Sequence, residues 1–321
     1  MARAILRKQP WRIPARTMAS APSRPYKFHI GASFAGKTSP KGPLQMPFPE
    51  DGVVGAWRDH TLAWPKGVRS TDCGQDFFFV QDMRNESGVS LGVADGVGGW
   101  VESGVDPSLF SQALMFHAHR YSRNAWAGEP EIDPTLDYEE REEIEGWEMT
   151  PYECLDLAYG GVLREKFVQA GSSTACLLTM NASSGVLRSA KQLTKLPVNS
   201  QRRYARACVD KPSEADTFRT KLGDGDIVIA YVRRHLTPLA TDGLSDNVFA
   251  SEIVTICSLV SRRGGTEDQQ VQAIADRLVE YARQCMTKKA RVSPFEREAA
   301  RHGMFFRGGV RGVSSFYPRI G

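Results

Sequence analysis

The order of strand-like and helix-like segments is the feature that most restricts the fold of this chain. Strand patterns come in adjacent groups, helix patterns follow in groups of their own, and no stretch alternates strand, helix and strand. Parallel strands need a long crossover connection, whereas antiparallel strands can be joined by a short turn. The chain therefore predicts a layered α+β architecture of antiparallel sheets rather than a doubly wound parallel sheet.

The patterns that carry this prediction are spread over most of the 321 residues. Alternating or continuous apolar runs predict strands in QDFFFVQDM, GVSLGVADG, GSSTACLLTMNASSGVLRSA and TFRTKLGDGDIVIAY. Apolar residues at intervals of three and four predict helices in PSLFSQALMFHAHRYSR, TPYECLDLAYGGVLREKFVQ, NVFASEIVTICSLVSR, TEDQQVQAIADRLVEYARQCM and SPFEREAARHGM. The acidic stretch GEPEIDPTLDYEEREEIEG is interpreted as a solvated insertion.

Charge is distributed very unevenly. Before Glu50 there are five arginines, four lysines and no acidic residue, so this segment carries +9 while the whole chain carries +4. An arginine-rich start that lacks acidic residues is typical of a mitochondrial transit peptide. A disordered basic tail is the alternative. Because the basic charge belongs to this segment, it does not indicate a nucleic-acid surface.

Cysteine spacing and hydropathy exclude several other classes. The six cysteines are scattered without a Cys-x-x-Cys pair, which argues against a zinc knuckle or a disulfide framework and fits a reducing compartment. No apolar stretch approaches the length that a membrane helix requires.

Three aspartates follow or begin strand patterns in similar surroundings: Asp76 in GQDFFFV, Asp95 in GVADGVGGW and Asp242 in TDGLSDN. Hard divalent cations prefer carboxylate, carbonyl and water oxygens. Glycine after an aspartate lets another group approach the backbone closely. Two of the three are Asp-Gly, and an ordinary Asp-Gly turn between two strands is the alternative for GVADGVGGW taken alone.

In this order, the motifs resemble the metal-dependent protein phosphatases of the 2C type, and in particular their mitochondrial branch, the family of protein phosphatase 2C homolog 7. The matching pieces run from about Gly74 to Gly309: GQDFFFV, LGVADGVGGW, GSSTACLL, KLGDGDIVIA, TDGLSDNVFASEI and SPFEREAARHGMFFRGG. The resemblance implies an αββα sandwich, in which two antiparallel sheets pack face to face between helices. It divides the chain into a transit peptide and linker at 1–50, a phosphatase domain at 51–309 and an atypical tail at 310–321.

The resemblance also implies the site residues. Asp95 would bridge two Mn²⁺ or Mg²⁺ ions, the Gly96 carbonyl would bind one ion, Asp242 would bind the other, and Asp76 would hold metal-bound waters. Arg69 is a candidate contact for the substrate phosphate. Asp246 is expected to support the site.

By the same resemblance, the chain would be a monomeric serine/threonine phosphatase of the mitochondrial matrix. A hydroxide between the two ions would attack phosphoserine or phosphothreonine directly. The implied substrates are phosphoproteins, with enzymes of ubiquinone synthesis as one candidate group, and neither nucleic acid nor a transmembrane segment is expected.

Four departures from the family pattern bear on activity. Val97 stands where many relatives have a histidine, and Ala190 runs directly into KQLTKLPV, which suggests that a central strand is missing. The segment Val232 to Ala240 is an apparent insertion, and no acidic residue follows Glu298, so the last metal carboxylate is absent. The departures leave two alternatives open: a pseudophosphatase that binds phosphoproteins, or an unstable product of an aberrant gene model.

The remaining polar motifs have ordinary structural interpretations. His117 and His119 are two apart on a helix and therefore face different ways. The GDGD sequence at 223–226 is interpreted as a hairpin turn, because a calcium loop would be longer and would end in glutamate. Ser172 to Thr174 form a strand start with no evident base beside them, and Phe77 to Phe79 are expected in the core.

Overall fold

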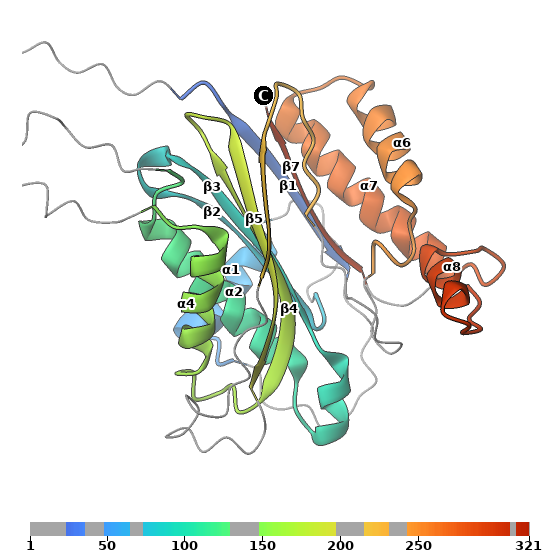
Figure 1. Ribbon diagram of the computed structural model, residues 1–321, viewed down its shortest axis with the longest axis horizontal. Helices are drawn as coiled ribbons and strands as arrows, with labels where there is room; N and C mark the ends of the chain where they lie inside the picture. The colour runs from blue at the N-terminus through green and yellow to red at the C-terminus, as the bar shows by residue number, and fades with distance from the viewer. Residues whose placement is uncertain are drawn as a thin grey trace, which may run out of the picture.

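The computed structural model describes residues 24–35, 48–64, 73–128, 148–196, 215–230, 243–308 and 313–320. They form two antiparallel sheets with helices on the outer sides (Figure 1). The larger sheet has the strand order β2-β3-β4-β5-β6, and the smaller sheet pairs β1 with β7. The predicted α+β class and the antiparallel sandwich flanked by helices are confirmed.

The elements from β2 to β6 and from α6 to α8 follow the sequence patterns closely, whereas β7 lies in the tail for which no strand was predicted. The strands are β1 (Phe28–Ala35), β2 (Asp76–Asp82), β3 (Gly88–Gly96), β4 (Gly171–Asn181), β5 (Val186–Leu196), β6 (Asp216–Lys221) and β7 (Val313–Ile320). The helices are α1 (Val53–Ala63), α2 (Pro107–Asn124), α4 (Pro151–Val162), α6 (Ala250–Ser261), α7 (Glu267–Thr287) and α8 (Pro294–Arg301), with short 3₁₀ turns η1 (Arg84–Glu86) and η2 (Gly98–Ser103).

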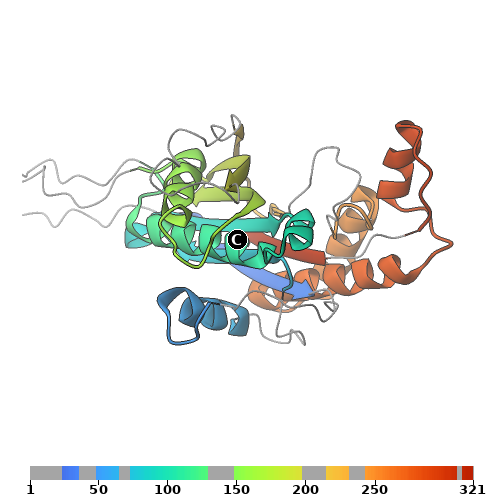
Figure 2. The same ribbon diagram turned by 90° about the horizontal axis from the view of Figure 1, so that it is seen from below.

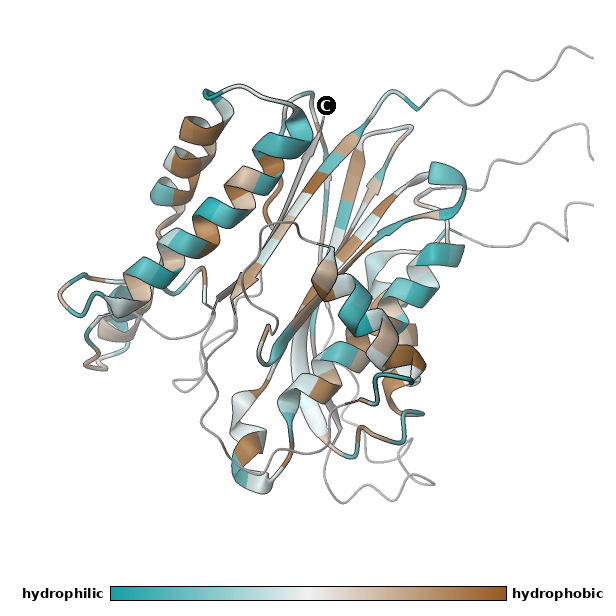
Figure 3. Cartoon of the chain, turned by 180° about the vertical axis from the view of Figure 1, so that it is seen from behind, coloured by the Kyte–Doolittle hydropathy of each residue, from teal (hydrophilic) through white to brown (hydrophobic). Residues whose placement is uncertain are grey.

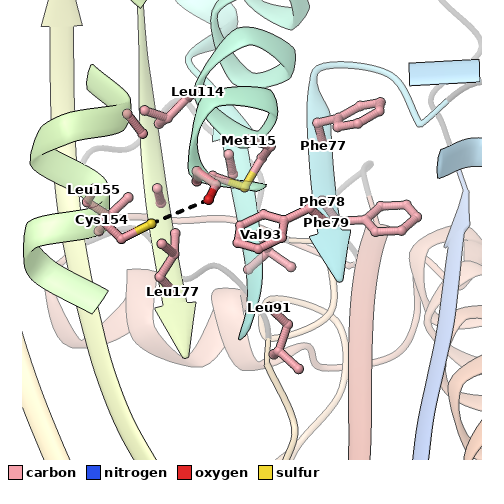
Figure 4. Close-up of a cluster of buried hydrophobic side chains, with 14 of the residues drawn as sticks. Phe77, Phe78, Phe79, Leu91, Val93, Leu114, Met115, Cys154, Leu155 and Leu177 are labelled. Carbon is pink, nitrogen blue, oxygen red and sulfur yellow. Dashed lines mark hydrogen bonds between the residues drawn. The ribbon is translucent and has the colours of Figure 1, made fainter. Parts of the chain in front are cut away.

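Helices α2 and α4 cover one face of the larger sheet. The Asp106 carboxylate accepts a hydrogen bond from Ser108 N at 2.9 Å and caps α2, with proline at its first position. Most of α2 is buried, and its side chains meet those of β2, β3 and β4 in the cluster of Figure 4. There the Cys154 thiol of α4 donates to the Ala118 carbonyl of α2 at 3.5 Å. The packing of α2 and α4 therefore buries this face of the larger sheet.

The phenylalanines of β2 show which residues face which layer. Phe77 and Phe79 point to the helices, where their rings lie 5.3 Å from Trp57 and 6.3 Å from His119. Phe78 points the other way and meets Phe34 of β1 at 5.7 Å. Because side chains alternate along a strand, every second residue of β2 faces the smaller sheet. The prediction that all three phenylalanines are core residues is confirmed.

The open edge of β1 is covered by a side chain of α7. Gln272 accepts a hydrogen bond from Ala32 N at 3.3 Å and donates one to Ala32 O at 2.8 Å. Its amide thus occupies the donor and acceptor of β1 that a neighbouring strand would otherwise pair. A Cβ at Gly31 would lie 2.5 Å from the Val271 backbone, so this glycine allows the close approach of β1 to α7.

Residues 227–230 join two hydrophobic clusters. Val228 and Ala230 pack with the cluster beneath α2 and α4, whereas Ile227 and Ile229 pack with a second cluster formed chiefly by α6 and α7. Figure 3 shows hydrophilic and hydrophobic residues interleaved along α7, as expected for an amphipathic helix. Seen from below, α8 projects beyond this helix pair (Figure 2).

The structure differs from the sequence-based expectations in three places. β1 lies within the segment assigned to the leader and linker, so part of that segment belongs to the folded domain. β5 runs unbroken past Ala190 and pairs with β4 and β6, so the expected gap does not occur at this point of the larger sheet. The buried strand predicted after the GDGD turn is not a regular strand over its described residues 227–230, of which Ile227 and Ala230 form β-bridges.

The expected insertions and the absence of a membrane helix can be compared with the structure only for the residues that it describes. Residues 232–240 and most of the acidic stretch lie outside the described residues. Where the structure describes the chain, no helix combines the length and apolar character needed to span a bilayer.

The buried imidazole of His119 predicts a pH dependence of stability. Burial lowers its pKa from 6.5 to about 4, with smaller effects from Arg123 and His60. Between these values the unfolded chain binds a proton at this position and the folded chain does not. The contribution to stability is therefore complete above pH 6.5 and is lost as the pH falls toward 4. Because the ring is partly exposed, we expect about 1 kcal/mol between pH 7 and pH 5.

Urea unfolding at both pH values measures this effect. The variant His119→Leu should lose less stability than the original chain when the pH is lowered from 7 to 5. An equal pH dependence in the His119 variant would contradict the assignment.

Candidate metal centre

Two carboxylates lie opposite each other at one end of the β2–β3 pair. The strand register places Asp76 directly across from Asp95, and directly opposed residues project to the same face. Asp76 shares its face with Phe78 and so faces the smaller sheet. Asp95 is 7% exposed and Asp76 is half-buried. The register therefore brings these two candidate residues side by side.

Close packing fixes the backbone at Gly96. Its N–H donates to the Gln75 carbonyl at 3.1 Å, and that same carbonyl accepts from the Ser111 hydroxyl at 2.7 Å. A Cβ on Gly96 would lie 2.5 Å from the Pro107 carbonyl oxygen and 2.8 Å from that of Gln75. Glycine is therefore required here because the end of β3 fits between β2 and the start of α2.

The residues after Asp95 are tied to β4. Val97 N donates to the Ser172 carbonyl at 2.9 Å, and the Trp100 indole donates to the Ser172 hydroxyl at 2.7 Å. The Ser173 hydroxyl donates to the Asp95 carbonyl at 2.9 Å. These contacts hold the glycine-rich turn against a neighbouring strand, so the carboxylate of Asp95 extends from a fixed backbone.

Thr174 is a neighbour of Asp95 that the sequence reasoning did not identify as a candidate. It is the register partner of Asp95 on β4, so both side chains project from the same face. It is 9% exposed, and its hydroxyl oxygen has no hydrogen-bond partner within the described part of the molecule. The serine and threonine run was considered only as a nucleophile or a strand start. Only the register between strands could have placed the hydroxyl beside Asp95.

This donor set suits a hard divalent cation. Like charges directly opposite each other in an antiparallel pair repel, and a cation near both carboxylates would offset this repulsion. The unpartnered hydroxyl of Thr174 could bind a coordinated water on the same face. Carboxylate, carbonyl and water oxygens are the ligands that Mg²⁺ and Mn²⁺ prefer. Asp76, Asp95 and Gly96 therefore fit the metal that the sequence led us to expect.

Several predicted site residues are not placed by the structure. Asp242 and Arg69 lie outside the described residues. Asp246 is half-buried, and its carbonyl accepts from Phe295 N at 3.2 Å. Across the ranges that are described, no three His, Cys, Asp or Glu side chains form a cluster able to hold a metal ion.

The two histidines of α2 have structural roles, as the sequence suggested. The His117 imidazole hydrogen-bonds Glu165 at 2.9 Å, and burial lowers the pKa of His117 despite this carboxylate. His119 instead lies among the rings of Trp57 and Phe79. The two side chains thus face different neighbours.

The glycines of this turn provide a test of the close packing. Neither Gly96 nor Gly99 has a positive φ, so alanine is compatible with both backbones. Gly96→Ala should lower the free energy of unfolding by about 1–3 kcal/mol through overpacking. Gly99→Ala should change it by less than about 0.5 kcal/mol, because nothing lies within 4 Å of its added Cβ. Urea denaturation compares the two, and similar losses of stability would argue against the packing at Gly96.

Comparison with known proteins places the chain in a family. No protein-family model matches it. It is 30% identical over 283 residues to the protein phosphatase PTC7 homolog fig of Drosophila willistoni, covering 80% of this chain and 79% of that protein. It is 28% identical over 265 residues to the homolog fig of Drosophila melanogaster, covering 74% of this chain and 73% of that protein.

Other similarities extend beyond flies. The probable protein phosphatase 2C 80 of Arabidopsis thaliana is 28% identical over 262 residues, covering 76% of this chain and 54% of that protein. Among solved structures, the photosystem II phosphatase PBCP is 23% identical and has a TM-score of 0.49, covering 77% of this chain and 90% of that one. The chain belongs to the 2C-type protein phosphatases, a family of hydrolases, and within it resembles PTC7.

Proposed function

We propose that this chain hydrolyses phosphoserine and phosphothreonine in proteins, at a centre of two Mn²⁺ or Mg²⁺ ions held by Asp95, the Gly96 carbonyl and Asp242, with Asp76 binding coordinated waters. The observation that carries the proposal is the register of β2 and β3, which sets Asp76 opposite Asp95 on the inner face of the sheet. The family membership supports the phosphatase reaction itself.

The reaction replaces one phosphorus–oxygen bond by another. A water oxygen forms a bond to phosphorus as the bond to the serine or threonine oxygen breaks, and that oxygen takes up a proton. Bound divalent ions would supply a water with a lowered pKa and would offset negative charge on the phosphoryl group. The Thr174 hydroxyl would orient a water beside Asp95. Val97 cannot donate a proton, so the leaving oxygen must be protonated by water or by another group.

The turn after Asp95 also suits a protein substrate. Gly99 is exposed, and nothing lies within 4 Å of the position of a Cβ there. A phosphorylated side chain on a folded protein can reach only a site whose rim has such free space. The small residues next to Asp95 therefore favour a phosphoprotein over a small phosphoester that would need an enclosing pocket.

A second candidate function is phosphoprotein binding without hydrolysis. It is favoured by the absence of any acidic residue after Glu298, which removes the last carboxylate expected for the family. β7, within this tail, pairs with β1 along its whole length. The tail thus has a place in the smaller sheet but brings no metal-binding carboxylate.

We also propose that the protein acts in the mitochondrial matrix, with enzymes of ubiquinone synthesis among its candidate substrates, and that it acts as a monomer. The location is supported by the arginine-rich start and by the resemblance to PTC7. The substrates rest on the family resemblance.

Replacing the paired carboxylates tests the proposed reaction. Asp95→Asn and Asp76→Asn should each lower Mn²⁺-dependent hydrolysis of a phosphothreonine peptide by about 10²-fold or more, because each removes charge that holds or orients the centre. Asp82→Asn, at the exposed opposite end of β2, is the matched control and should leave activity unchanged. Hydrolysis is measured with Mn²⁺ titrated and with EDTA as a blank.

The three variants separate the two candidate functions. Activity that needs Mn²⁺ and depends on Asp95 supports the phosphatase. If the protein unfolds cooperatively and binds the phosphopeptide without hydrolysing it, the binding function is supported instead. Activity that persists in EDTA or in the Asp95 variant would rule out the proposed centre.

The position of β1 predicts where a leader could be removed. Tyr26 N donates to the Ala182 carbonyl at 3.1 Å, and the Tyr26 ring occupies the space beside Gly185. The folded domain therefore includes residues from Tyr26 onward. N-terminal sequencing of the protein recovered from mitochondria should find a start before Tyr26. A start beyond Ala35 would remove β1 and would contradict this boundary.

A further inference from the structure

Helices α6 and α7 leave an open hollow along one side of their contact. The two helices lie next to each other at the edge of the molecule (Figure 1), and the hollow between them has a volume of about 310 Å³. Its apolar lining comes from Ile256, Leu259 and Val260 of α6 and from Ala273 of α7. Because Ala273 carries only a methyl group, α7 contributes little that could fill this space.

The apolar lining is partly exposed to solvent. Leu259 is 55% exposed, and Figure 3 shows hydrophobic residues along most of α6. A single exposed leucine needs no explanation. Here, however, its side chain forms a wall of a concave space. An apolar side chain of a partner that filled the hollow would remove both the space and Leu259 from water.

Two arginines stand at the ends of the hollow. Arg263 lies in the turn after α6 and Arg277 lies on α7, and both are exposed. Gln270 marks the end at the turn, because its amide nitrogen donates to the Gly265 carbonyl at 2.9 Å. From Gln270 to Arg277, α7 makes about two turns and rises about 10 Å. The two cations therefore flank an apolar floor of this length.

The acidic residues at the start of α7 do not neutralise these arginines. Glu267 and Asp268 contact the His29 imidazole of β1, at 2.9 and 2.7 Å. Within the part of the chain that the structure describes, Arg263 and Arg277 form no ion pair. Two exposed positive charges thus remain beside an apolar surface, which is complementary to an acidic and partly apolar partner.

The lining favours an amphipathic helix over an extended peptide or a small molecule. The backbone groups of α6 and α7 are paired within each helix, so an extended peptide laid against them would find no partners for its own backbone. A helix pairs its backbone internally and can place apolar side chains, three or four residues apart, in a groove between two helices. A small molecule would be poorly enclosed, because exposed side chains form the walls.

We propose that the hollow between α6 and α7 is a docking site for an acidic amphipathic helix of another protein. Leucine-sized side chains of that helix would fill the space beside Leu259, and acidic residues about seven positions apart would reach Arg263 and Arg277. The site lies on other elements than the strands that carry Asp76 and Asp95. It therefore goes beyond the proposed function, because it would recruit a partner without using the candidate metal centre.

A labelled helical peptide tests the proposal with the full chain. The probe is an alanine-rich peptide that has two glutamates seven positions apart and two leucines midway between them. Fluorescence anisotropy measures its dissociation constant in EDTA. Arg263→Glu, Arg277→Glu and Leu259→Ser alter the hollow. Arg283→Glu is the matched control, because it changes the net charge equally at an exposed position of α7 that does not line the hollow.

Each substitution in the hollow should weaken binding of the probe about 5-fold. The effect of the two arginine reversals should shrink in about 0.5 M NaCl, because salt screens exposed charges, whereas the effect of Leu259→Ser should persist. Replacing both glutamates of the probe by glutamine, or both leucines by alanine, should weaken binding about 10-fold. Arg283→Glu should leave the dissociation constant within about 2-fold. Urea unfolding verifies that each variant is folded, as expected for exposed positions.

Three outcomes would overturn the proposal: no binding at about 1 mM probe, equal binding of the glutamine probe, or equal weakening by Arg283→Glu. Sedimentation velocity adds a fourth. A dimer that Leu259→Ser dissociates would mean that a second copy of the chain occupies the hollow, and the acidic helix would be ruled out. None of these results bears on the proposed phosphatase reaction, because binding is measured in EDTA and without hydrolysis.

Discussion

The pairing of Asp76 with Asp95 is the constraint on which the candidate site depends. It is set by strand register alone, and a slip of one residue between β2 and β3 would break the opposition of the two carboxylates. The register is held by the apolar residues beyond the pair. Phe77 and Phe79 must face the helices while Phe78 faces β1. Hydrophobic packing on both sides of β2 thus determines where two charged groups meet.

Much of this arrangement could be predicted from the sequence because the relevant signals are local. Asp106 before a proline marks the start of α2, and GVSLGVADG has the composition of a fully buried strand. The position of Thr174 could not be predicted in this way. Its proximity to Asp95 depends on how β4 aligns with β3, which no pattern within either strand specifies.

The misassigned segments have physical explanations. β1 was not expected because FHIGASFA lies among basic and proline-rich residues and gains its stability from α7, more than 200 residues away in the chain. Residues 227–230 alternate as a strand would, and their side chains divide between two hydrophobic clusters, but only Ile227 and Ala230 form β-bridges. The alternation was correctly identified, whereas the regular strand predicted from it is not formed in these residues.

The strands that carry Asp76 and Asp95 and the segment 243–249 pack in different parts of the core. Asp76 and Asp95 extend from strands packed in the cluster beneath α2 and α4, whereas residues 243–249 contribute to the second cluster through Leu244 and Val248. The register of β2 and β3 sets Asp76 opposite Asp95. Arg291 holds residues 243–249 by donating hydrogen bonds to Glu252 and to the Asn247 carbonyl.

The pairing of β1 with β7 has a consequence for how the chain folds. These strands are more than 270 residues apart in the sequence and pair along their whole length, so the smaller sheet cannot form before Ile320 has been synthesised. The larger sheet needs only residues up to β6. During synthesis, the larger sheet could therefore form first, and the face that later packs against β1 and β7 would stay uncovered until then. That face carries Phe78 as well as the two aspartates, so an apolar surface would stay exposed to solvent until β1 and β7 pair.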